Sequence, residues 1–390
     1  MSLPLYKDHD APKEFKIDYN TGLWYNKFCN KWDNDYKKID KDKWLETVTG
    51  DTGAAGLSVG KAELISEMNW RFSNLIEGLN GKIGIFKNQW RFVTGLGIEH
   101  PVENGFAWHH TLGTPYLPGS SVKGLVRSWA TNWADITEEE KPDTINRIFG
   151  PEGTGKKNAG SVIFFDALPA NTVKLDKEVM TPHYSEYYRN NEAPADWLKP
   201  VPIVFLTVAP EQTFVFAVAP RHPENSSESD DVNLPNDVEI VMKWLQEALA
   251  WCGAGAKTAT GYGRFIPDRK AAEAWIIKRK QHQSKEQQAD KEKTEKQREK
   301  ARQLSFASMS PIRQEMEQDG YSDNQEKFMT SLSQKWLNKM DEANIPSENR
   351  LEIASLLAQW YQLYKPEQWQ KPNPKNTAKI ARIKSVLEKQ

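Results

Sequence analysis

The feature that most constrains this chain is residues 253–265, where four glycines form a Gly-x-Gly-x5-Gly-x-Gly array. Glycine lets the backbone turn through positive φ and approach a ligand closely. Successive N–H groups in such turns form a concavity that suits anions. Lys257 and Arg264 add positive charge, and the run contains no acidic residue. The pattern predicts a loop that holds a phosphate backbone, either of a nucleotide or of a nucleic acid.

A second candidate phosphate site lies just after a Pro-Gly turn at residues 118–119. Ser120 or Ser121 is placed to cap the helix that follows. Lys123 and Arg127 lie four residues apart and therefore share one face of that helix. A helix start with free N–H groups, two hydroxyls and two cations suits a phosphate. Taken alone, a capped helix with solvated cations explains this run better, but beside the glycine array we prefer the phosphate site.

Strand and helix signals alternate through the middle of the chain. In order they predict a strand at 90–97, a helix from about 120, strands at 161–168, 202–209 and 213–219, a helix at 238–251 and a strand from 264. The short turn between the third and fourth of these strands suggests a hairpin. We therefore predict an α+β fold on the ferredoxin-like (RRM-like) βαββαβ plan with insertions, with both phosphate sites near the ends of its elements.

Charge and composition limit the kinds of partner. The chain has 390 residues and a formal net charge of -1, so any nucleic-acid site must be a local patch. Two cysteines without metal-ligand spacing fit a reducing compartment. We see neither a signal peptide nor a membrane span, and expect a cytoplasmic protein without metal or cofactor. The 15 tryptophans suit a core or surfaces buried against partner subunits, and the sequence favours neither.

An insert between the predicted strands at 161–168 and 202–209 adds further candidate RNA contacts at residues 181–189. Exposed aromatic rings beside histidine and arginine can stack on bases, so His183 and Tyr184 are candidate RNA contacts. Packing against the sheet explains these rings equally well.

The chain divides into four predicted parts: residues 1–80 form an N-terminal arm or helical extension, 81–268 the ferredoxin-like domain, 269–303 a charged linker or solvated helix, and 304–390 a small helical domain. From 269 to 302 there are 12 Lys or Arg against 6 Asp or Glu, which could attract RNA but is typical of a plain linker. Three apolar stripes at helical spacing, separated by prolines, indicate the final helical domain. We expect that domain to dock on a neighbouring subunit.

Both candidate phosphate sites carry a resemblance to a known family. Residues 118–127 resemble the motif after the first strand of RAMP proteins, the RNA-binding family of CRISPR systems, and residues 253–265 resemble that family's C-terminal glycine-rich loop. More narrowly, the chain is similar to the subgroup that supplies the sixth RAMP subunit of Cmr-type (subtype III-B) effector complexes. The stretches that look like this subgroup are residues 22–28, 165–169, 181–184 and 255–263. The resemblance runs from about residue 20 to about 267.

The resemblance implies a structural RNA-binding subunit rather than a nuclease. It places the chain at the head end of the complex, near the 3′ end of the guide crRNA. It implies contacts with a neighbouring RAMP head subunit, the repeated backbone RAMP subunit and a small helical subunit, with the target RNA reached only indirectly and no membrane. The residues to which we assign RNA contact are Gly119, Ser120, Ser121, Lys123, Arg127, Gly253, Gly255, Lys257, Thr258, Gly261, Gly263 and Arg264.

Two rival functions stay open at this stage. Some RAMP relatives are guide-processing endoribonucleases that use His, Tyr or Lys for acid–base chemistry on a 2′-hydroxyl, and His109 and His110 precede the basic helix. The simpler explanation is that one imidazole packs in the core while the other touches RNA or solvent. Asp166 has no second carboxylate nearby in sequence, so we expect it to cap a strand end. The other rival, a scaffold that touches only protein, would leave the glycine array and Lys123 without a role.

Overall fold

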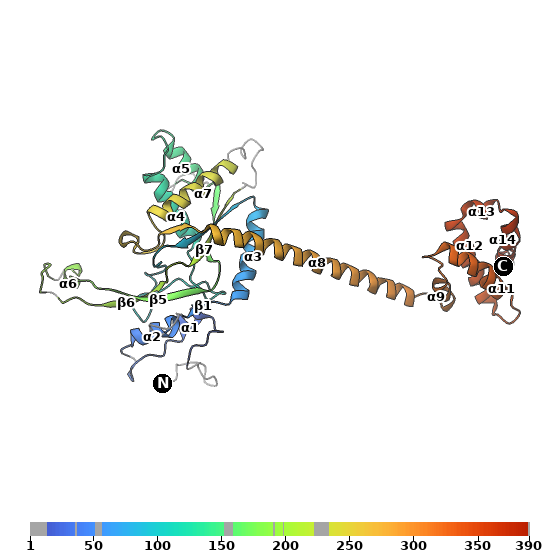
Figure 1. The fold of residues 1–390 in the computed structure, drawn as a ribbon, viewed down its shortest axis with the longest axis horizontal. Helices are drawn as coiled ribbons and strands as arrows, with labels where there is room; N and C mark the ends of the chain where they lie inside the picture. Colours follow the sequence, from blue (N-terminus) through green and yellow to red (C-terminus); the bar gives the residue numbers. More distant parts are fainter. Residues whose placement is uncertain are drawn as a thin grey trace. The chain divides into compact units, whose positions relative to one another are not determined.

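The structure, a computed structural model, describes residues 14–35, 37–50, 57–151, 159–189, 192–197, 199–221 and 234–388. The chain forms two compact units, residues 1–282 and residues 283–390 (Figure 1). Unit 1 combines two antiparallel sheets with helices, and unit 2 is helical. The predicted mixed fold with a helical C-terminal region is therefore confirmed.

A five-stranded antiparallel sheet forms the centre of unit 1. Its strands are β2 (Lys82–Asn88), β3 (Val162–Phe164), β4 (Leu168–Pro169), β7 (Thr213–Pro220) and β8 (Phe265–Pro267). The order across the sheet is β3-β7-β2-β8, and β4 also pairs with β7. β7 is therefore central and almost wholly buried.

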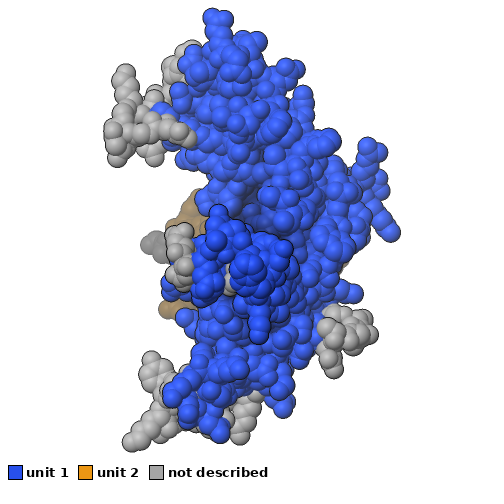
Figure 2. All heavy atoms as spheres, turned by 90° about the vertical axis from the view of Figure 1, so that its left-hand side faces the viewer, with its two compact units in different colours: residues 1–282 blue, residues 283–390 orange. Residues whose placement is uncertain are grey.

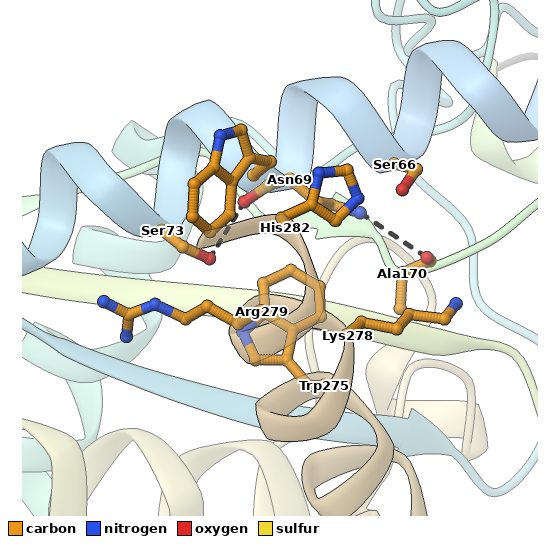
Figure 3. A pocket seen from close by; sticks show the side chains of 9 residues that line it. Ser66, Asn69, Ser73, Ala170, Trp275, Lys278, Arg279 and His282 are labelled. Atoms are coloured by element: carbon orange, nitrogen blue, oxygen red, sulfur yellow. Dashed lines mark hydrogen bonds between the residues drawn. The ribbon is translucent and has the colours of Figure 1, made fainter. Parts of the chain in front are cut away.

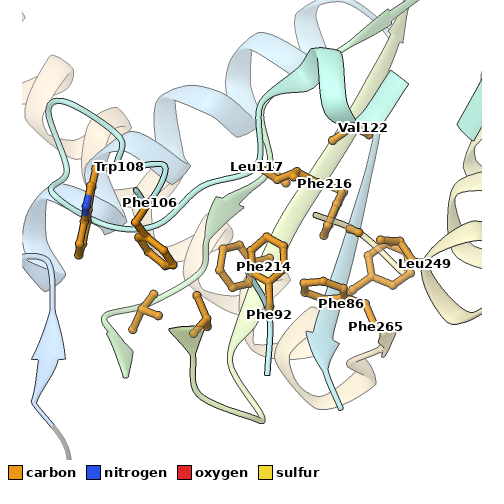
Figure 4. Packing of buried hydrophobic residues seen from close by; sticks show 14 of the residues in the cluster. Phe86, Phe92, Phe106, Trp108, Leu117, Val122, Phe214, Phe216, Leu249 and Phe265 are labelled. Carbon is orange, nitrogen blue, oxygen red and sulfur yellow. The ribbon is translucent and has the colours of Figure 1, made fainter. Parts of the chain in front are cut away.

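Helices cover both faces of this sheet. The helices are α3 (Ala62–Gly78), α4 (Gly119–Asn132), α5 (Lys141–Phe149), α7 (Leu234–Trp251) and the first turns of α8 (Arg269–Ala307). Side chains alternate between the two faces along a strand. Phe214 and Phe216 of β7 thus join the cluster that includes α4 and α7 (Figure 4), while Val215 joins the cluster with α3 and Trp275 of α8. The two faces have separate cores.

A smaller sheet of order β1-β5-β6 lies beside the N-terminal helices. Its strands are β1 (Ser58–Val59), β5 (Val173–Met180) and β6 (Ile203–Val208). The neighbouring helices are α1 (Thr21–Lys27) and α2 (Lys41–Thr49). Lys177 of β5 ties the sheet to α2, since its Nζ donates to Asp42 at 2.8 Å and to Glu46 at 3.0 Å. β5 and β6 extend away from the body of unit 1 and carry α6 (Ser185–Tyr188) near their far end (Figure 1).

Two strand predictions were wrong. The first strand is β2 rather than residues 90–97, which keep only a single bridge between Phe92 and Val208. The expected hairpin of residues 202–219 does not form, because β6 pairs with β5 and β7 pairs with β2. The cause is the fully buried Asn88, whose Nδ2 donates to Ala209 O at 2.8 Å and whose Oδ1 accepts the Gln212 N–H at 2.7 Å. These bonds fix the bend that separates the two strands.

The predicted strand at 161–168 is also interrupted. β3 ends at Phe164, and Ala167 instead exchanges backbone hydrogen bonds with Leu117 at 2.8 and 3.1 Å. The interruption brings Asp166 to the start of α4, where the candidate site lies.

Unit 2 is a small helical body with its own core. Its helices are α9 (Pro311–Gln318), α10 (Gln325–Ser331), a π-helical turn η2 (Leu332–Trp336), α11 (Leu337–Asp341), α12 (Ser347–Tyr364), α13 (Pro366–Gln370) and α14 (Pro374–Leu387). Trp336 and Trp360 are fully buried, and their indole N–H groups donate to Asp319 Oδ2 and Tyr321 O at 2.9 and 3.0 Å. Residues 269–303, left open between linker and helix, lie within α8, and α8 has no buried residue.

The tryptophans divide between the core and the surface. Trp24 and Trp44 are buried in unit 1, whereas Trp133 and Trp197 are 69% and 82% exposed. Within the described residues, no helix has the length and apolar character needed to cross a bilayer.

Candidate nucleic-acid interface

The glycine loop, residues 253–263, turns as its sequence predicts. All four of its glycines have positive φ: Gly253 at 79°, Gly255 at 83°, Gly261 at 95° and Gly263 at 70°. These are left-handed conformations that other residues adopt rarely. Thr258 begins a short 3-10 turn, η1 (Thr258–Thr260), between the two glycine pairs.

Backbone crowding within the protein accounts for most of these glycines. A Cβ on Gly255 would lie 2.0 Å from Val93 O, and one on Gly263 would lie 1.9 Å from Ala254 O. The loop N–H groups that we expected to face an anion are partly used internally: Ala256 N donates to Val93 O at 2.8 Å, and Gly263 N donates to Arg91 O at 2.9 Å. Gly261 differs, because nothing lies within 4 Å of the place of its Cβ. The array thus serves first to pack the loop against residues 91–93.

The two cations of the loop face different neighbours. Lys257 is half-buried in the left-handed region (φ 58°), and its Nζ lies 5.4 Å from the centre of the Phe205 ring in β6. Such a contact is a cation–π interaction. Arg264 donates from Nη1 to Ala250 O at 3.3 Å, near the end of α7. The loop therefore lies against the smaller sheet, with Lys257 directed toward β6.

The start of α4 is already occupied by a carboxylate. The Gly119 N–H donates to Asp166 Oδ1 at 2.6 Å, and the N–H groups of Ser121 and Val122 donate to Pro118 O. The predicted cap by Ser120 or Ser121 was wrong: the helix begins earlier, at Gly119, so both serines lie inside its first turn. The expectation that Asp166 caps a strand end is corrected too, since it caps a helix. An acidic group at a helix start takes the place that an anion would use.

No residue other than glycine fits at position 119. A Cβ there would lie 2.5 Å from Phe164 O. The close approach brings α4 onto the end of β3, which leaves the next turns of the helix to present Lys123 and Arg127.

A cluster of three cations forms along α4: Lys123, Arg127 and Arg221, named here the α4 cation cluster. Burial lowers the pKa of Lys123, and the nearby positive charges of Arg127 and Arg221 lower it further. Arg221 is held in place by its Nε, which donates to Gly160 O at 3.1 Å. Arg127 lies over the Phe149 ring at 6.0 Å. A bound anion would relieve the mutual repulsion of these charges.

Sequence reasoning missed Arg221. It follows β7 directly and is exposed. Its position after a predicted strand was visible, but nothing in the local pattern placed it beside α4. Only the pairing of β3 with β7 brings it there.

His109 lies in a tight loop rather than in an open cleft. Its Nδ1 accepts the Leu112 N–H at 3.2 Å, and its ring meets that of Tyr116 edge-on at 5.7 Å. Burial lowers the pKa of His109, while the charge of Asp166 acts in the opposite direction. His110 is exposed, and its carbonyl accepts the side-chain N–H of Asn20 at 2.7 Å.

The two candidate RNA contacts of the insert, His183 and Tyr184, lie away from His109 and His110. His183 is exposed and Tyr184 half-buried, with ring centres 6.4 Å apart. They lie between β5 and α6, on the part of unit 1 that extends toward the viewer's side in Figure 2. The structure thus brings Lys123 and Arg127 together, whereas Lys257, His183 and Tyr184 belong to the side of the smaller sheet.

Comparison with known proteins assigns the family. The model of the RAMP superfamily matches residues 47–266, which is more than half of the chain. The chain belongs to the RAMP superfamily. The RAMP region contains the glycine loop, α4 and both sheets up to residue 266 in β8, and it ends before α8.

Two curated relatives of this RAMP protein are CRISPR proteins. It is 30% identical to the CRISPR system Cmr subunit Cmr6 of Pyrococcus furiosus, over 52% of this chain and 73% of the relative. It is 29% identical to the CRISPR system CMR subunit Cmr6 of Saccharolobus solfataricus, over 42% of this chain and 48% of that relative. The chain thus spans about half the length of the second relative.

Solved structures also match parts of this chain. One is the cryo-EM structure of the type III-B Cmr-beta bound to cognate target RNA, with 23% identity, a TM-score of 0.45, and 59% of this chain and 71% of that chain covered. Another is the crystal structure of Cmr6 from Pyrococcus furiosus, with 29% identity, a TM-score of 0.32, and 48% of this chain and 97% of that chain covered.

Proposed function

We propose that this chain is a non-catalytic, RNA-binding subunit of a type III-B Cmr complex. In this proposal it caps the head end of the complex in the cytoplasm and holds the 3′ region of the guide crRNA during antiviral defence. Its protein neighbours are a RAMP head subunit, the repeated backbone RAMP subunit and a small helical subunit. It reaches target RNA only through the complex.

The observation that carries the proposal is the α4 cation cluster within a RAMP domain. Lys123, Arg127 and Arg221 gather positive charge in a chain whose net charge is -1, so the attraction for phosphate is local. Lys257 adds a further cation on the glycine loop, where its Nζ lies over the buried Phe205 ring. The resemblance to Cmr6 of Pyrococcus furiosus supports the choice of complex.

The strand order also supports a ferredoxin-like core. Leaving out the inserted strands, the chain runs β2, α4, β3, β7, α7, β8, with sheet order β3-β7-β2-β8. This succession has the order of the βαββαβ plan, and we propose that β4 and the β5–β6 pair are insertions into it.

The test is ultraviolet crosslinking of the assembled complex, followed by sequencing of the crosslinked RNA. The wild-type complex is compared with one that carries Lys123→Ala and Lys257→Ala. We expect wild-type crosslinks near the guide 3′ end and their loss in the double variant. Lys243→Ala, an exposed lysine of α7, is the matched control and should leave the crosslinks unchanged. An intact complex whose wild-type subunit crosslinks no RNA would instead support a protein-only scaffold.

One alternative has a structural observation behind it. His109 lies close enough to Asp166 for the carboxylate to affect its pKa, as in many acid–base pairs. A guide-processing endoribonuclease would use His109 or the neighbouring His110. Because Nδ1 of His109 already accepts a backbone N–H, we favour a structural role for this ring. Cleavage of guide precursor by the purified chain, abolished by His109→Ala or His110→Ala, would establish the enzyme.

A further inference from the structure

The two halves of unit 2 carry opposite charge. Residues 311–364, which run from α9 to α12, contain 5 Lys or Arg against 9 Asp or Glu. Residues 365–390, which include α13 and α14, contain 7 Lys or Arg against 2 Asp or Glu. Unit 2 lies beyond residue 266, where the match to the RAMP family ends. That match therefore assigns no role to the positive half.

Three lysines of the positive half are exposed and form no ion pair within the described residues. We name them the α14 lysine surface, and they are Lys371, Lys375 and Lys384. Two other cations of α14 are used inside unit 2. Lys379 donates to Ser333 Oγ at 2.6 Å. Arg382 donates from Nε to Asp341 Oδ2 at 2.8 Å. The three exposed lysines thus keep their charge available to a partner.

Polar and aromatic contacts fix α13 and α14 against each other (Figure 1). Gln368 Oε1 of α13 accepts the Asn373 N–H at 3.1 Å and the Asn376 side-chain N–H of α14 at 3.4 Å. Lys384 Nζ of α14 lies 5.1 Å from the centre of the Trp369 ring of α13. The lysines between and beside these contacts are therefore carried by a rigid pair of helices.

The spacing of the α14 lysine surface is short. Lys371 and Lys375 are four residues apart, so their Cα atoms are separated by at most about 14 Å. Lys375 and Lys384 are nine residues apart on one helix, which is about 14 Å along its axis. Lys384 also contacts Trp369, two residues before Lys371. A short stretch of an extended polyanion can therefore meet all three charges.

The composition of this surface favours a phosphate backbone over a protein partner. Protein interfaces are depleted of lysine, and aromatic and other apolar side chains gather at their centre. Among the described residues, none of the large apolar side chains that are exposed lies within 365–388, and the closest in sequence, Leu363, belongs to α12. A phosphate backbone requires cations and no apolar centre.

We propose that the α14 lysine surface binds the phosphate backbone of RNA without reading its sequence. Each ammonium group neutralises a phosphate and releases its counterions, and contacts of this kind carry no base information. The inference rests on the proposed function for the presence of RNA. It uses neither the α4 cation cluster nor the glycine loop.

The test measures affinity for single-stranded RNA by fluorescence anisotropy over a salt series, with the full chain. The variant carries Lys371→Gln and Lys375→Gln, which remove two charges and keep polar side chains. Because two phosphate contacts are lost, the slope of log affinity against log salt should fall by about 1.4. We expect the affinity to fall about fivefold, and equally for two RNAs of unrelated sequence.

Two matched variants show whether the position of the charge matters. Lys371→Arg with Lys375→Arg keeps both charges and should retain the affinity. Lys243→Gln with Lys327→Gln removes the same charge from exposed lysines of α7 and α10, and should leave the slope unchanged. If the two Gln pairs lower the slope equally, net charge alone acts and the inference is wrong.

Three further outcomes separate this inference from the proposed function. If Lys123→Ala with Arg127→Ala weakens RNA binding while the Gln pair at 371 and 375 changes nothing, the inference falls alone. An assembled complex whose wild-type subunit crosslinks no RNA would overturn both. If an amine-reactive crosslinker joins Lys371 to another subunit, and the Gln pair weakens assembly but not RNA binding, the surface docks on protein and the inference is wrong.

Discussion

The glycine loop and α4 both looked like phosphate sites in the sequence, yet different physics shapes them. In the loop, Gly255 and Gly263 are required because backbone carbonyls lie about where a Cβ would stand. On α4, Lys123 and Arg127 lie together with Arg221 although their charges repel. The first arrangement is explained from inside the protein. The second would favour an anion beside it.

This difference teaches how to weigh two common signals. A glycine pattern reports that the backbone must pass close to something, and that neighbour can be the protein's own chain. Lys123, Arg127 and Arg221 repel one another, and this repulsion lowers the free-energy cost of placing an anion beside them. We therefore give the cation cluster more weight than the glycine pattern in proposing a phosphate partner.

The largest expected effect comes from crowding in the glycine loop. Gly255→Ala would put a Cβ 2.0 Å from Val93 O at a φ of 83°. We expect it to lower the free energy of unfolding of unit 1 by about 3 kcal/mol, because strain and a backbone clash add. Chemical denaturation followed by circular dichroism measures this loss.

The matched control is Gly261→Ala, where φ is 95° but nothing lies within 4 Å. Only the left-handed backbone is then strained, at a cost of about 1 kcal/mol. Equal losses in the two variants would show that crowding against residues 91–93 does not shape the loop.

Substitutions in the α4 cation cluster should instead change the affinity for RNA. Lys123→Ala with Arg127→Ala removes two candidate phosphate contacts, so the slope of log affinity against log salt should fall by about 1.4. We expect affinity for a guide-length RNA to fall about tenfold, with unfolding changed by no more than about 0.5 kcal/mol. Fluorescence anisotropy over a salt series measures both quantities. A slope that stays the same would remove the cluster from the interface.

Substitution of Asp166 tests whether the start of α4 is capped by this carboxylate or binds an anion. Asp166→Ala should destabilise unit 1 by about 1 kcal/mol, the usual worth of a helix cap, while Asp166→Asn keeps an acceptor for the Gly119 N–H and should lose less. Thermal unfolding of the two variants gives the comparison. If Asp166→Ala leaves stability unchanged and strengthens RNA binding, the helix start itself takes a phosphate.

The smallest effect is a dependence of stability on pH. Burial lowers the pKa of His100 and of His109 below the ordinary value of 6.5. The unfolded chain then binds more protons, so stability is full above pH 6.5 and falls as the pH drops through that value. Urea unfolding between neutral and mildly acidic pH measures the slope. His100→Asn should flatten it, whereas the exposed His110→Asn should not; a slope unaffected by His100→Asn would refute this origin.

Local pattern predicted the helices of unit 1 better than its strands. α4 and α7 follow from apolar spacing and lie where we expected them. β2 was missed because residues 90–97 carry the stronger aromatic alternation. The pairing partners of β6 and β7 depend on Asn88, whose contacts lie more than 100 residues away.

The site shows the same limit. Lys123 and Arg127 share a helix face, so their spacing was enough to group them. Arg221 joins them only through sheet pairing, and Asp166 reaches Gly119 only because β3 stops early. The stacking of Trp70 of α3 on His282 of α8 (Figure 3) was beyond sequence reasoning, since most of unit 1 separates these two residues in the sequence.

The buried amide of Asn88 has a consequence for how this protein meets a ligand. Its Nδ2 donates to the carbonyls of Trp90 and Ala209 at 2.7 and 2.8 Å, and its Oδ1 accepts from Gln212. These bonds hold the junction between the two sheets, from β2 to the segment that follows β6. The glycine loop and the β5–β6 strands both lie against this junction, so a strand of RNA would meet a preorganised surface. Little of the binding free energy would then be lost to ordering the protein.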